Sequence, residues 1–208
     1  MAFFKRIRKG SRSRREHYQS SHRFEHWYAD NQVYFITARC RDRVPAFASE
    51  QAKVIFWDRF RYYTHKYGFI PWVTSLLDNH YHTLGYIYNG ENLPQLMRHL
   101  HGSVAKLVND TYPLGPPASV GGEPRPSRLV PFWRDTKGRE YFDGCIRDEK
   151  QCWLAYRYTL TQARRHGVSD APATYPHTQA PIDVDHGVRR ATEVGAFLEA
   201  LPYKRYRS

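Results

Sequence analysis

The chain is most constrained by residues 76–87, which read Leu-Leu-Asp-Asn-His-Tyr-His-Thr-Leu-Gly-Tyr-Ile. The polar pair Asp78-Asn79 predicts a turn, and the residues after it predict a strand over 80–88. Alternate side chains of a strand share one face, so His80 and His82 lie on the same face, about 7 Å apart. Two imidazoles placed in this way can bind one divalent ion, or they can be two polar residues on a solvated strand face.

The same spacing recurs in a different local structure at His99 and His101. These residues lie in a segment, 92–110, whose apolar residues recur with helical periodicity. Two positions on a helix are separated by roughly 200°, so the two rings should diverge. Only the first pair is therefore expected to share an ion.

The other elements are predicted from hydrophobic periodicity and from capping residues. Ser49 and Gly68 bound an amphipathic helix, and the segment after it is apolar enough to be a strand that pairs with 80–88. Predicted strands are 34–38, 69–77 and 80–88; predicted helices are 50–67, 92–110 (apolar stripe Leu93, Leu96, Leu100, Val104 and Leu107), 147–166 and about 188–201; a hairpin is predicted at 132–142.

Charge and composition divide the chain into three parts. Thirty-two Lys and Arg stand against 20 Asp and Glu, a net charge of +12, which is typical of proteins that bind nucleic acid. We expect a basic arm over 1–26, one domain over 27–170 with a Pro/Gly-rich loop at 111–130, and a basic extension over 171–208, which binds DNA or only packs. The residues expected to contact DNA phosphates are Lys5, Arg6, Arg8, Arg12, Arg14, Arg15 and, beyond the arm, Arg165. The alternative for the arm is a solvated terminus.

Three observations narrow the cellular setting and the class of site. The sequence has no apolar run long enough to span a membrane and no signal peptide at its start, so no membrane role is expected. Its three cysteines form no even disulfide set, which favours a cytoplasmic location. They also form no Cys-x-x-Cys pair, which argues against a zinc module.

The predicted helix 147–166 separates two tyrosines. On a helical wheel Tyr156 falls in an apolar sector that should pack on the domain, together with Trp153, Leu160 and Ala163. Tyr158 and Gln162, four residues apart, fall on nearly the opposite side with Arg165 beside them. A tyrosine turned away from the packing face is either an ordinary surface residue or a functional one.

These residues together resemble a known family. The chain is similar to the IS200-like Y1 transposases, including the tyrosine transposases associated with repetitive extragenic palindromes (REP), within the HUH single-strand endonuclease superfamily. The resemblance covers about 27–175. It rests on the aromatic first strand, Asn79-His80-Tyr81-His82, the segment 141–149 and a helix that ends in Arg165-His166-Gly167-Val168. Two positions differ from the palindrome-associated proteins: Asp78 replaces a usual proline, and Gln162-Ala163 replaces a usual Asn-Pro.

The resemblance implies a fold, a reaction and a set of roles. The expected fold is α+β: a ferredoxin-like antiparallel sheet with packed helices, the His-x-His motif on a central strand and the tyrosine on a C-terminal helix. The implied activity is metal-dependent cleavage and rejoining of single-stranded DNA at hairpin-associated sites, through a 5′-phosphotyrosine. Tyr158 is the implied nucleophile, and His80, His82 and Gln162 are the implied ligands of Mg²⁺ or Mn²⁺ in a homodimer.

Two alternatives remain open from the sequence. A domesticated relative could bind DNA hairpins without cleaving them. A replication initiator or relaxase does the same chemistry, but commonly places its histidines after the tyrosine or uses a third histidine. The sequence also leaves open whether Tyr158 acts on the histidines of its own chain or on those of a second copy.

Overall fold

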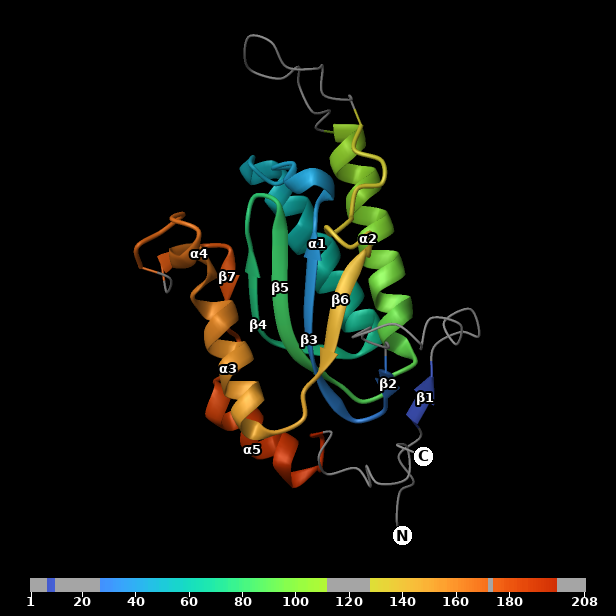
Figure 1. Cartoon of the computed structure of the whole chain (residues 1–208), viewed down its shortest axis with the longest axis vertical. Coiled ribbons are helices and arrows are strands. Elements are labelled where there is room, and N and C mark those ends of the chain that lie inside the picture. Colours follow the sequence, from blue (N-terminus) through green and yellow to red (C-terminus); the bar gives the residue numbers. More distant parts are fainter. Residues whose placement is uncertain (1–6, 10–26, 112–127, 172–173, 198–208) are drawn as a thin grey trace.

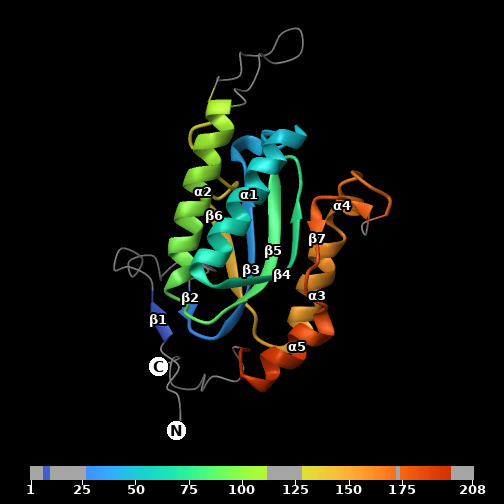
Figure 2. The same ribbon diagram turned by 180° about the vertical axis from the view of Figure 1, so that it is seen from behind.

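The computed structural model describes residues 7–9, 27–111, 128–171 and 174–197. An antiparallel sheet of five strands has helices on both faces (Figures 1 and 2). The strands are β1 (Ile7–Lys9), β2 (Trp27–Ala29), β3 (Gln32–Arg39), β4 (Phe69–Leu76), β5 (His80–Ile87), β6 (Tyr141–Cys145) and β7 (Thr178–Gln179). The helices are α1 (Glu50–Tyr67), α2 (Asn92–Thr111), α3 (Glu149–Leu160), α4 (Gln162–Arg165) and α5 (Val184–Glu193), and a 3₁₀ turn covers Arg41–Arg43. The predicted α+β class is confirmed.

The strand with the two histidines is the middle one of the sheet. The order is β6-β3-β5-β4-β7, and all the pairs are antiparallel. In the register between β3 and β5, Arg39 lies opposite His80 and Thr37 lies opposite His82. Tyr81, between the histidines, points to the other face and is fully buried there. Strand alternation therefore places both imidazoles on one face, as predicted.

The opposite face is covered by α1 and α2. Ser49 caps α1 by accepting a hydrogen bond from the Ala52 amide, and Gly68 ends it with a left-handed φ of 68°. Phe56 and Phe60 from α1 pack with Tyr81 in the largest of the three core clusters of the described residues. The predicted helix bounds are confirmed here. In α2 the stripe differs from the prediction by one position, because Val108 is buried while Leu107 is exposed.

Two local predictions are wrong. Lys137-Gly138 does form a turn, with φ 76° at Gly138, but its two arms separate: Trp133 bridges Cys40, whereas β6 pairs with β3. The predicted hairpin 132–142 is therefore absent: Trp133 forms one isolated bridge just beyond β3, and of the two arms only β6 pairs with β3 as a strand. The helix predicted for 188–201 instead begins at Val184, where Asp183 accepts hydrogen bonds from the amides of Asp185 and His186.

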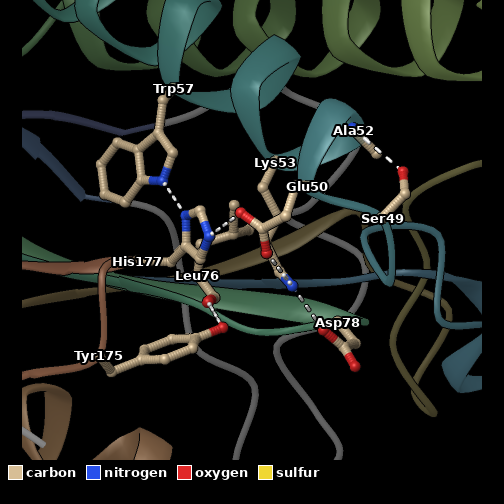
Figure 3. Close-up of polar contacts among 9 residues, drawn as sticks. All are labelled: Ser49, Glu50, Ala52, Lys53, Trp57, Leu76, Asp78, Tyr175 and His177. Atoms are coloured by element: carbon tan, nitrogen blue, oxygen red, sulfur yellow. Dashed lines mark hydrogen bonds and ion pairs between the residues drawn. The ribbon is translucent and has the colours of Figure 1, made fainter.

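The C-terminal part of the chain belongs to the sheet. β7 pairs with β4, and α5 packs with α3 in a second core cluster that includes Trp72 and Tyr156. A polar network fixes the approach to β7 (Figure 3). The Trp57 indole N–H donates to His177 Nδ1 at 3.0 Å, and the Tyr175 hydroxyl donates to the Leu76 carbonyl at 3.0 Å.

The same network includes two acidic residues at the ends of neighbouring elements. His177 Nε2 lies 2.8 Å from Glu50, and Lys53 Nζ lies 3.1 Å from Asp78 (Figure 3). Asp78 lies in the turn that leads into β5. The segment 175–179 is thus held against both α1 and the turn that leads to His80.

Two predicted regions lie largely outside the described residues. Of the arm 1–26 only β1 is described, and it pairs with β2. Of the loop 111–130 the structure describes only Thr111 and 128–130. Within the described ranges, no helix combines the length and the apolar character needed to cross a membrane.

Candidate active site

Tyr158 lies directly beside the strand histidines of its own chain. The ring centroids of His80 and His82 are 5.1 Å apart, and those of His82 and Tyr158 are 5.2 Å apart, with the rings nearly perpendicular. Phe35 on β3 lies beside both: its ring stacks on His82 at 5.7 Å and meets Tyr158 edge-on at 6.0 Å. Tyr158 remains 37% exposed, so its hydroxyl can meet a substrate while its ring is held by aromatic neighbours.

Each histidine has its Nδ1 engaged. Asn79 donates its amide N–H to the Arg43 carbonyl at 3.1 Å, so its Oδ1 accepts from Nδ1–H of His80 at 2.6 Å. Thr37 Oγ1 lies 2.7 Å from Nδ1 of His82. A proton on Nδ1 leaves Nε2 with a lone pair, which is the arrangement that orients metal-ligating histidines. The Nε2 of His80 is buried and has no hydrogen-bond partner.

The local electrostatics keep these imidazoles neutral. Burial, then the nearby His166 and Arg39, lowers the pKa of His80 to about 3. Burial, then His80 and Arg39, lowers the pKa of His82 well below 6.5. Since protonation would remove the lone pair, a depressed pKa keeps both nitrogens available as ligands at neutral pH.

Gln162 occupies a different environment from the one predicted. We expected it on the side of the helix away from the domain, but it is fully buried. Helix α3 ends at Leu160 and the short helix α4 begins at Gln162. Tyr158, four residues before Gln162, also faces the sheet through Phe35 and His82. Gln162 donates through Nε2 to the Tyr158 carbonyl at 2.9 Å, and its buried Oε1 has no partner.

The donor set fits a divalent ion with mixed nitrogen and oxygen ligands. His80 Nε2 and Gln162 Oε1 are buried polar atoms without hydrogen-bond partners among the described residues, and such atoms are costly unless something binds them. The described residues contain no group of three or more His, Cys, Asp or Glu placed to hold a metal. A site here would consist of two imidazoles and one carboxamide, with the remaining positions left for water or substrate.

Two neighbours of the histidines were not singled out from the sequence. The ring of His166 lies 4.8 Å from that of His80, and burial followed by Arg39 and Arg165 lowers its pKa. Arg39 lies opposite His80 on β3 and adds positive charge to the same face. Strand alternation in 34–39 could have identified Arg39, whereas the contact of His166 with His80 depends on tertiary packing that no local pattern predicts.

The predicted DNA contacts separate into two groups. The guanidinium of Arg165 lies 4.8 Å above the Tyr158 ring, so this residue is part of the site. Lys5, Arg6, Arg12, Arg14 and Arg15 lie outside the described residues, and Arg8 is placed in β1 by its backbone. The structure therefore brings one of the predicted DNA-binding residues to Tyr158.

Tyr156 has the packing role that the sequence predicted for it. It is buried in the cluster between α3, α5 and the sheet, and its hydroxyl donates to the Ile182 carbonyl at 3.1 Å. Burial, then Asp183, raises the pKa of its phenol. Trp153 and Leu160, predicted beside it, are only partly buried, and Cys152 and Thr159 complete the buried face instead.

Comparison with known proteins places this geometry in a known fold. No family model and no curated protein sequence matches the chain. Its structure is similar to that of a REP-associated tyrosine transposase bound to a REP hairpin, with a TM-score of 0.59 and 15% sequence identity. The similarity covers 82% of this chain and 88% of the other. This chain therefore has the fold of a REP-associated tyrosine transposase.

Proposed function

We propose that this protein is a metal-dependent endonuclease and strand transferase that acts on single-stranded DNA next to a hairpin, with Tyr158 as its nucleophile. The observation that carries the proposal is the contact between the Tyr158 and His82 rings, 5.2 Å apart within one chain. The similar solved structure is described as a tyrosine transposase bound to a REP hairpin, which supports a hairpin as the recognised element. The net charge of +12 suits a polyanionic substrate.

The reaction needs only the phenol and the phosphodiester to balance. The Tyr158 oxygen loses its proton and forms a bond to phosphorus, while the bond from phosphorus to the 3′ oxygen breaks and that oxygen takes up a proton. The products are a 5′-phosphotyrosine and a free 3′-OH. Because the new phosphodiester retains the reactivity of the old one, a 3′-OH can reverse the attack and join strands without ATP.

Several residues stabilise this reaction by their position. His80, His82 and Gln162 would hold a Mg²⁺ or Mn²⁺ ion, which when bound supplies positive charge to the scissile phosphate. Phe35 supports the rings of His82 and Tyr158, and Arg165 lies over the Tyr158 ring. Arg39 and Arg165 both place positive charge where a phosphate would approach.

The decisive experiment compares two tyrosine variants on a hairpin-bearing single strand labelled on each side of the cut. Tyr158→Phe should form no covalent adduct on a denaturing gel, whereas Tyr156→Phe, a matched change two residues away, should still form it. The adduct should carry the DNA fragment downstream of the cut, linked through its new 5′ phosphate. Adduct formation by Tyr158→Phe, or a 3′-phosphate linkage, would exclude Tyr158 as the nucleophile. Hairpin binding without cleavage by the wild type would identify a non-cleaving binding protein.

We further propose that the protein acts as a homodimer in which each chain uses its own tyrosine. The proximity of Tyr158 to His82 within one chain supports this arrangement. Mixing Tyr158→Phe with His82→Ala protein should then restore no cleavage, although mixed dimers form. Recovered cleavage in the mixture would mean that the two copies exchange their tyrosines.

A further inference from the structure

An open groove of about 590 Å³ lies between α3 and the edge strand β6, and Tyr158 is one of its lining residues. Phe142 and Gly144 line it from β6, and Leu154, Arg157 and Arg165 line it from the helical side. We propose that this groove binds one unpaired nucleobase of the DNA strand, next to the phosphate that Tyr158 attacks. The inference rests on the proposed function and adds a subsite that selects the nucleotide beside the cut.

The β6 side of the groove offers a ring for stacking. In the register between β3 and β6, Phe142 lies opposite Thr37 and Gly144 lies opposite Phe35, so both β6 residues share the face of the sheet that carries His82. The guanidinium of Arg139 lies 5.5 Å from the centre of the Phe142 ring. Phe142 lines the groove, and an aromatic ring in a groove is a surface on which an unpaired base can stack.

The depth of the groove depends on a missing side chain. Gly144 sits in a regular antiparallel ladder, and a Cβ built there would lie 3.4 Å from the nearest atoms of Phe142, an ordinary contact. No left-handed backbone angle requires glycine at this position. A larger side chain could therefore be accommodated by the strand and would occupy the space above Phe142.

The charge of the walls selects a nucleotide over an apolar peptide. Among the described residues that line the groove, none is acidic, and Arg157 and Arg165 supply two positive charges. An unpaired base presents a flat apolar face between two phosphates, so it matches a groove that is apolar on the β6 side and carries two arginines on the helical side. The volume is within the range of about 300–1,000 Å³ found for small-ligand sites.

The test measures binding in a Tyr158→Phe background, so that no covalent adduct disturbs the equilibrium. Full-length protein is titrated with hairpin-bearing single strands in which one nucleotide at a time, on either side of the cut, is abasic. One position should weaken binding by about ten-fold, the scale of one stacked base. Adding Gly144→Leu should weaken binding of the intact strand by a similar factor and remove the effect of the abasic position.

A matched control uses the other side of the molecule. Gly102 is exposed on α2, with no atom near its built Cβ, so Gly102→Leu makes the same chemical change far from the groove. It should keep the affinity and the abasic profile of the parent. If Gly144→Leu proves unstable, Leu154→Glu tests the same groove, because Leu154 is 60% exposed and its replacement disturbs no core. Its control is Val54→Glu on α1, at 61% exposure.

The outcomes separate this proposal from the function on which it rests. An abasic profile that is unchanged by Gly144→Leu and by Leu154→Glu would overturn the groove as a base site. The same conclusion follows if the wild type cleaves DNA but no abasic position weakens binding by the parent. Failure of the wild type to cleave, with a position-sensitive profile that Gly144→Leu removes, would overturn only the cleavage. Absence of any DNA binding would overturn both.

Discussion

The two His-x-His pairs of this protein have the same spacing in the sequence, but their side chains are arranged differently in the structure. On the strand β5, His80 and His82 point to one face, with their rings 5.1 Å apart. On the helix α2, His99 turns to Tyr67, whose hydroxyl lies 2.9 Å from its Nδ1, while His101 enters the core on the other side. The divergence predicted for the helical pair is confirmed. Spacing in the sequence acquires a chemical meaning only through the local backbone geometry.

Burial alone also fails to distinguish a structural from a functional histidine. His101 is fully buried and both of its ring nitrogens have partners: Nε2 lies 2.8 Å from the Tyr81 hydroxyl and Nδ1 lies 3.0 Å from Glu140. His80 is almost as buried, but its Nε2 has no partner. A buried polar atom without a hydrogen-bond partner destabilises the folded protein, and a bound ligand would supply that partner.

The largest effect expected from this contrast is on cleavage. His82→Ala should slow cleavage of a hairpin-bearing strand by about a thousand-fold, because the site would lose several kcal/mol of stabilisation of the transition state. Hairpin affinity should change little, since the basic surface provides it. His99→Ala, the matched change on α2, should cleave within about two-fold of the wild type. Single-turnover cleavage rates at saturating protein concentration measure both variants. Equal losses of rate in the two variants would mean that the strand pair has no special role in cleavage.

A smaller effect is expected on stability, and here the helical pair should matter more than the strand pair. His101→Ala should lower the free energy of unfolding by about 2–4 kcal/mol, because it leaves the buried Tyr81 hydroxyl unpaired beside Trp133. His80→Ala should cost about 1 kcal/mol, since it also removes an unsatisfied buried nitrogen. Urea unfolding of the metal-free proteins measures both values. A larger loss for His80→Ala would indicate that His80 is a core residue.

The sequence predicted the parts of this contrast that depend on short-range periodicity. The alternation around His80 and the caps Ser49 and Gly68 set β5 and α1 nearly to the residue. The break at Thr161 was missed because 147–166 contains no proline and no glycine, so nothing local interrupts the helical pattern. The burial of Gln162 and the approach of His166 to His80 depend on packing between segments that are distant in the sequence.

The burial of His80 should also appear in the pH dependence of the free energy of unfolding. The unfolded chain binds protons at its histidines below about pH 6.5, whereas the folded protein keeps His80 neutral down to about pH 3. The unfolded state thus binds more protons, and stability falls as the pH falls through this window. Between its folded and unfolded pKa values, each such histidine changes the free energy of unfolding by about 1.4 kcal/mol per pH unit.

The measurement is urea unfolding at several pH values between 7 and 4.5 with chelator present. His80→Ala should flatten the slope by about one proton, and His101→Ala should also flatten it, because burial lowers the pKa of His101. An unchanged slope in His80→Ala would mean that His80 binds its proton alike in the folded and the unfolded protein over this range.

The smallest effect expected is a shift of the melting temperature by metal. Mn²⁺ at about ten times its dissociation constant should add about 1.4 kcal/mol of stability, a shift of roughly 3–6 °C for a chain of this size. His82→Ala should lose this shift and His99→Ala should keep it. An equal shift in both variants would place the ion elsewhere on the protein.

The network around His177 has a consequence for how the protein is made. β7 covers the outer edge of β4, and Tyr175 and His177 bind the Leu76 carbonyl and α1. A nascent chain that has emerged only to α4 already contains His80, His82 and Tyr158, but β4 is then an open edge able to pair with another chain. Translation must proceed beyond Gln179 before the sheet is complete. Synthesis therefore passes through a stage in which the site residues are present while the sheet that positions them is still exposed to misassembly.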